Sequence, residues 1–148
     1  MTGGTWRIRV TAIAAAAVIL AAGLAVRLLS GGAGALDGST ALAQNAGTAL
    51  YAALIYAGVV VLFPATRPLT AALTAIAFCW AVELLQLTPV PALLCGRSVI
   101  ARLVLGAHFD PADMLWYPIG VIPLAALHAL LRRRGRARQE PPAVSAGP

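Results

Sequence analysis

Charged side chains are scarce in this sequence. Only 11% of its 148 residues are Asp, Glu, Lys or Arg, whereas a soluble domain usually carries about 25%. A chain with so little polar surface cannot cover itself in water, so a soluble globular fold is excluded. The apolar residues, 60% of the chain, form long blocks rather than short amphipathic runs, and the mean hydropathy is +0.85. The composition therefore predicts a protein that is embedded in a lipid bilayer.

Lysine is absent and cysteine occurs only twice. All eleven basic residues are arginine, which together with the abundance of alanine is typical of a GC-rich bacterial genome. Cys79 lies within an apolar block and Cys95 lies in a predicted loop, so the two lack the close spacing of a zinc or redox pair. We therefore expect two free thiols, and the sequence predicts no cofactor.

Four apolar blocks are long enough to cross the hydrocarbon core, which takes about 20 helical residues. A shorter apolar stretch, 98–109, is better suited to an interfacial or re-entrant segment that precedes the last block. We therefore predict an all-α, polytopic transmembrane bundle of about four helices, built as a single membrane domain over residues 1–131. The predicted helices are about 8–29, 45–63, 69–87 and 114–131.

The first block has a competing interpretation as a secretory signal, because small residues around Gly34 and Ala35 resemble a cleavage site. The apolar region of a signal peptide is typically about 7–15 residues long. The block at 8–29 is longer than that. We therefore expect a retained transmembrane helix.

The placement of the arginines predicts the orientation of the chain. Three would lie on one side of the membrane and eight on the other; the three are Arg27, Arg97 and Arg102, and the eight are Arg7, Arg9, Arg67, Arg132, Arg133, Arg134, Arg136 and Arg138. The positive-inside rule makes the richer side cytoplasmic. We predict a multi-pass protein of the inner or plasma membrane with both termini cytoplasmic, and a basic, disordered tail over 132–148. We expect that tail to set topology or contact anionic lipid rather than to bind nucleic acid.

Glu83 is the ionisable residue that lipid should tolerate least. It lies near the outer end of the third block, where a carboxylate is costly unless it is protonated or paired. Cys79, Glu83 and Gln86 share one helical face, which we expect to point into the bundle. Candidate partners at the same membrane face are Arg27, Arg97, Arg102 and Asp113.

Two interpretations of these polar residues remain open. In the first, Asp110 and Asp113 cap the last helix, Arg27 extends to the headgroups, and Glu83 makes one structural ion pair. In the second, the groups line an outward-facing pocket, where Glu83 is an acid, a base or a cation ligand and the arginines hold an anionic headgroup. The candidate pocket consists of Arg27, Glu83, Gln86, Arg97 and Asp113, with Arg102, His108 and Tyr117 as secondary candidates.

No motif in the sequence identifies a reaction. It has no Gly-rich phosphate loop, no Ser-His-Asp order and no paired cysteine motif. His108, Asp110 and Asp113 form an H-x-D-x-x-D run that suits a divalent metal if Glu83 joins it, but capping explains the aspartates and we predict no metal. The sequence favours, without deciding it, a non-enzymatic role: binding or sensing an amphiphile or cell-envelope component. The alternatives are a lipid- or envelope-modifying enzyme that uses Glu83 and Asp113, a small transporter subunit, or a structural assembly partner.

A longer pattern runs from the third block into the last: 82–87, Arg97, 103–106, Phe109, Asp113, Tyr117 and Gly120. In order and spacing this pattern resembles the small bacterial membrane family named domain of unknown function 2809, and the likeness extends over roughly 9–131. Where that family tends to place an aspartate in the second helix, this chain has Thr48. The pattern is also loosely similar to the VanZ-like family linked to glycopeptide resistance. The resemblance implies a four-helix membrane protein and assigns no reaction.

Overall fold

Helices make up the regular structure of the chain. The computed structural model describes residues 3–30, 37–96, 98, 104–105 and 109–137, and these contain no strand. Four of the helices are long and apolar enough to cross a membrane, which confirms the predicted all-α fold class and makes this a multi-pass membrane protein. The helices are α1 (Gly3–Ser30), α2 (Asp37–Leu62), α3 (Pro68–Leu85), α4 (Val90–Cys95) and α6 (Asp113–Ala137).

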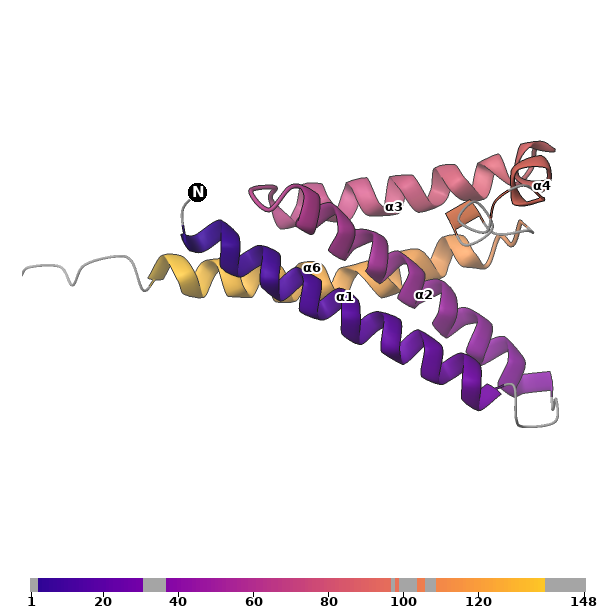
Figure 1. Cartoon of the computed structure of the whole chain (residues 1–148), viewed down its shortest axis with the longest axis horizontal. Helices are drawn as coiled ribbons and strands as arrows, with labels where there is room; N and C mark the ends of the chain where they lie inside the picture. The colour runs from indigo at the N-terminus through magenta and orange to yellow at the C-terminus, as the bar shows by residue number, and fades with distance from the viewer. Residues whose placement is uncertain (1–2, 31–36, 97, 99–103, 106–108, 138–148) are drawn as a thin grey trace, which may run out of the picture.

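Helix α2 is the centre of the bundle, because it packs against α1, α3 and α6, and α3 also packs against α6. The start of α1, the α2–α3 connection and the end of α6 lie at one end of the bundle, which we call the termini face (Figure 1). Helix α4 and the start of α6 lie at the opposite end, which we call the Glu83 face (Figure 1). The buried residues between the helices are mostly small, as is usual where membrane helices approach closely; they include Ala52, Ala53, Ala57, Ala71, Ala72, Ala75 and Cys79.

The closest approach of α2 and α6 requires a glycine. A Cβ atom added at Gly120 would lie 1.9 Å from the backbone oxygen of Ala49, which is far too close for two atoms that are not bonded to each other. Small residues of this kind allow membrane helices to pack backbone to backbone. Gly120 therefore sets the spacing of the helix pair that also carries Thr48 and Asp113.

Pro118 lies inside α6 and leaves one of its carbonyls without a helical partner. Proline has no backbone N–H, so the carbonyl of Met114, four residues earlier, loses its usual hydrogen bond. The indole Nε1 of Trp80 donates to that oxygen at 3.1 Å. Because an unsatisfied backbone group in lipid costs several kcal/mol, this side chain both compensates for the proline and ties α3 to α6.

Two arginines at the termini face bind the backbone around the end of α2. Arg9 Nε donates to the carbonyl of Val61 at 3.0 Å. Arg132 donates to the carbonyls of Thr66 at 2.7 Å and Ala65 at 3.3 Å. The last carbonyls of a helix lack helical partners and carry partial negative charge. The sequence predicted these arginines only as markers of orientation, yet they also join α1 and α6 to the α2–α3 connection.

The helix limits differ from the prediction by five residues or more in three places, of which the first is the start of α1, at Gly3 instead of 8. Helix α2 begins at Asp37 instead of 45, and α6 continues to Ala137 instead of ending at 131. The first arginines of the predicted disordered tail are therefore helical, since arginine is a good helix former and cations are favoured near helix C-termini. The short helix α4 follows Pro89, and Pro91 is tolerated in its first turn. Residues 138–148, and most of the predicted segment 98–109, lie outside the described residues.

Candidate functional site

Glu83 is buried near the end of α3, with 1% of its surface exposed. Cys79, one turn earlier on the same helix, is fully buried. Gln86 follows directly after α3 and is partly buried. The three residues therefore lie on the inward side of the bundle, as the i, i+4, i+7 spacing predicts for a shared helical face.

Both carboxylate oxygens of Glu83 accept a hydrogen bond. The backbone N–H of Asp110 donates to Oε1 at 2.7 Å, and the hydroxyl of Tyr117 donates to Oε2 at 2.5 Å. A buried carboxylate needs such partners to offset the loss of water. Among the described residues no arginine pairs with Glu83, so the contacts present connect α3 to the beginning of α6 without an ion pair.

The two aspartates at the start of α6 each contact α2. Asp110 Oδ1 accepts from the N–H of Ala112 at 2.9 Å, as helix-capping side chains do, and its Oδ2 accepts from Gln44 Nε2 at 3.3 Å. Asp113 Oδ1 accepts from the hydroxyl of Thr48 at 2.9 Å. Asp113 also lies in the first turn of α6, where negative charge is favoured by the helix dipole.

The backbone carbonyls of Val104 and Leu105 accept hydrogen bonds from side chains of this region. Gln86 Nε2 donates to the carbonyl of Leu105 at 2.5 Å, and the hydroxyl of Tyr51 donates to the carbonyl of Val104 at 2.8 Å. The other amide atom, Gln86 Oε1, is buried and has no hydrogen-bond partner among the described residues. One acceptor of this region is therefore left unsatisfied.

A pocket of about 320 Å³ lies between these groups. Its volume is at the lower end of the range of about 300–1,000 Å³ that is typical of small-molecule sites. The lining combines polar side chains from α2, α3 and α6 with a few apolar ones. Its residues are Gln44, Gly47, Thr48, Tyr51, Val82, Glu83, Gln86, Val104, Leu105, Asp113 and Tyr117.

The structure brings together four of the residues that the sequence proposed for a site: Glu83, Gln86, Asp113 and Tyr117. The remaining candidates lie outside the described residues or side chains; these are Arg27, Arg97, Arg102 and His108. Within the described residues, no three His, Cys, Asp or Glu side chains are grouped as metal ligands.

Sequence reasoning missed the contribution of α2. Gln44, Thr48 and Tyr51 line the pocket, and each donates a hydrogen bond to a group at the Glu83 face. Their spacing of four and three residues places them on one helical face. That periodicity was visible in the sequence, but it had no charged residue to draw attention to it.

Comparison with known proteins places the chain in one family. The family model described as "Protein of unknown function (DUF2809)" matches residues 38–121, which include the pocket. No curated protein and no solved structure matches the chain.

Proposed function

The chain belongs to the DUF2809 family, and we propose that it binds the polar head of an amphiphile or cell-envelope component in the pocket beside Glu83. In this proposal the termini face, which carries most of the arginines, is cytoplasmic. The pocket at the Glu83 face then opens toward the outside of an inner or plasma membrane. A ligand would reach it from the outer leaflet with its apolar part in lipid.

The observation that carries the proposal is the unpartnered oxygen of Gln86. Leaving a buried acceptor without a hydrogen bond costs about 1–3 kcal/mol. Gln86 Oε1 is such an acceptor, and Gln86 is one of the residues that line the pocket. A ligand that donates a hydrogen bond to this oxygen would recover the cost. The pocket therefore favours a head that carries donors.

The other lining groups narrow the chemistry of that head. Two carboxylates, Glu83 and Asp113, line the pocket, and none of the described lining residues is basic. A head with hydroxyl or ammonium groups suits this lining better than one with a bare anion, which the carboxylates would repel. Because both oxygens of Glu83 already accept hydrogen bonds from the protein, we assign Glu83 the role of holding Tyr117 and the start of α6 in place.

Occlusion of the pocket by a side chain on α2 tests the proposal. Gly47 lines the pocket, and a Cβ atom there would meet nothing within 4 Å. The variant Gly47→Leu should therefore fill the pocket without displacing the backbone. Gly58→Leu is the matched control, since Gly58 is on the same helix, has equally open space for a Cβ atom and does not line the pocket.

The measurement is mass spectrometry of the small molecules that copurify with each protein in mild detergent. We expect a hydroxylated or amine-bearing amphiphile with the wild type and with Gly58→Leu, and its loss from Gly47→Leu. Equal recovery of the same compounds from all three proteins would contradict the proposal. So would the absence of any copurified amphiphile from the wild type.

A further inference from the structure

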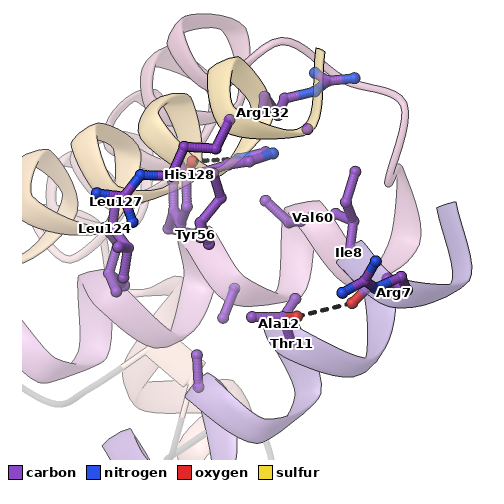
Figure 2. Close-up of a pocket in the computed structure, with 15 residues that line it drawn as sticks. Arg7, Ile8, Thr11, Ala12, Tyr56, Val60, Leu124, Leu127, His128 and Arg132 are labelled. Atoms are coloured by element: carbon purple, nitrogen blue, oxygen red, sulfur yellow. Dashed lines mark hydrogen bonds between the residues drawn. The ribbon is translucent and has the colours of Figure 1, made fainter. Parts of the chain in front are cut away.

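A second and larger pocket lies at the termini face, between α1, α2 and α6. Its volume is about 630 Å³, well within the range of about 300–1,000 Å³ for ligand sites. Figure 2 shows Leu124, Leu127 and His128 of α6 across the pocket from Ile8 and Ala12 of α1. This pocket shares no lining residue with the pocket beside Glu83.

The wall of this second pocket is apolar along the membrane-spanning part of the helices. Its side chains are alanines and branched aliphatic residues, so the wall is a surface of methyl and methylene groups. The apolar lining residues are Ile8, Ala12, Ala15, Ala57, Val60, Leu124, Leu127 and Leu131. Such a wall suits an acyl chain.

The rim of the same pocket is basic. Arg7, Arg132 and Arg134 line it, and no acidic side chain does so within the part of the chain that the structure describes. Arg132 is engaged with the carbonyls of Thr66 and Ala65. The side chains of Arg7 and Arg134 are exposed, and neither makes a hydrogen bond or an ion pair within the described part of the chain. Two guanidinium groups are therefore free to bind an anion at headgroup level.

The half-buried imidazole of His128 lies between the basic rim and the apolar wall. The hydroxyl of Tyr56 and Nδ1 of His128 share a hydrogen bond of 2.8 Å, which fixes the ring (Figure 2). The second ring nitrogen, His128 Nε2, is buried and has no partner among the described residues. It is a polar group suited to the ester region of a lipid, just below the charged head.

From these features we propose that an anionic phospholipid of the adjacent leaflet binds in this second pocket. Its phosphate contacts Arg7 and Arg134, its ester region contacts His128, and one acyl chain lies along the apolar wall. Charge complementarity selects the occupant: a basic rim above an apolar wall matches an anionic lipid and gives a zwitterionic lipid no comparable advantage.

The test measures lipid retention in mild detergent. The purified protein is exchanged into an equal mixture of phosphatidylglycerol and phosphatidylcholine with identical chains, and native mass spectrometry reports the bound lipids. We expect the wild type to retain phosphatidylglycerol preferentially. In the double variant Arg7→Gln/Arg134→Gln this preference should fall about thirty-fold, which corresponds to about 1 kcal/mol per arginine.

Arg67→Gln is the charge control, because Arg67 is exposed in the α2–α3 connection and does not line the pocket. It should keep the wild-type preference. Equal losses in Arg67→Gln and the double variant would indicate general electrostatic attraction and overturn the proposal. An unchanged preference in the double variant would overturn it as well.

A second pair of variants tests the acyl-chain part without changing charge. Ala15 lines the pocket, whereas Ala14 is exposed on the outside of α1. Ala15→Leu should lower the retention of phosphatidylglycerol several-fold, and Ala14→Leu should not. Glycerol phosphate added at the same concentration should fail to displace the lipid. Displacement by glycerol phosphate, or equal effects of the two alanine variants, would contradict a lipid site.

Discussion

The contact between Gly120 and Ala49 gives the sharpest test of how α2 and α6 pack. In Gly120→Ala the new Cβ atom would lie 1.9 Å from the oxygen of Ala49, while ordinary contact begins at 3.4 Å. The helices must therefore separate locally by the difference, 3.4 − 1.9 = 1.5 Å. The obstacle is backbone rather than the end of a flexible side chain, so rotamer changes cannot relieve it.

The expected cost follows from the contacts that cross this interface. Overpacking typically costs about 1–3 kcal/mol. The same helix pair carries the hydrogen bonds from Thr48 to Asp113 and between Tyr56 and His128, and hydrogen bonds between membrane helices average about 0.6 kcal/mol each. We expect Gly120→Ala to lower the free energy of unfolding by about 3 kcal/mol in total.

Reversible unfolding in mixed micelles, with the fraction of SDS raised stepwise and helicity followed by circular dichroism, measures this loss. Gly58→Ala is the control, because a Cβ atom there meets nothing within 4 Å. That variant should be neutral or more stable by up to about 1 kcal/mol, since alanine is the better helix former. If Gly120→Ala proved as stable as Gly58→Ala, the close approach of the two helices would be refuted.

Three further predictions concern hydrogen bonds at the Glu83 face and across α3 and α6, each checked by the same unfolding measurement. Trp80→Phe should destabilise the protein by about 1 kcal/mol because it removes the donor to the carbonyl of Met114. The loss should be smaller in a Pro118→Ala background, where the backbone N–H of residue 118 can bind that carbonyl. Equal losses in both backgrounds would contradict the idea that Trp80 compensates for the proline. Thr48→Val should cost about 1–2 kcal/mol because it removes the donor to a carboxylate, whereas the exposed Thr74→Val should cost nothing measurable. Glu83→Ala should cost about 2–4 kcal/mol by leaving two donors unpaired, while Glu83→Gln should stay within about 1 kcal/mol of the wild type because an amide can accept one bond and donate the other. Similar stabilities for the two Glu83 variants would mean that these bonds contribute little.

The sequence was sufficient to predict the number and approximate positions of the long helices. Hydrocarbon requires long apolar runs, so the runs themselves mark the spans. The same intolerance identified Glu83 and the helical face that it shares with Cys79. The limits of α2 and α6 were harder to predict, because a helix continues into the polar region beyond the membrane wherever the local helix propensity permits.

The partners of Glu83 could not be predicted from the sequence. An arginine is the obvious partner for a carboxylate in lipid, but the described contacts are the hydroxyl of Tyr117 and the backbone N–H of Asp110. Apolar periodicity indicates which face of a helix is buried and not which face of another helix it meets. Backbone donors leave no trace in the sequence at all. The pocket residues on α2 were missed for the related reason that their pairing depends on the crossing point at Gly120.

The forked contact of Arg132 with two carbonyls affects how the orientation of this chain can be studied. Membrane topology is commonly inverted by relocating positive charges, on the assumption that a basic residue acts only through its charge. Here the removal of Arg9 would also release the last turn of α2, and the removal of Arg132 would release the connection that follows it. A lysine substitute would preserve the charge without the planar fork. Relocation of Arg133, which is exposed, would separate insertion from folding.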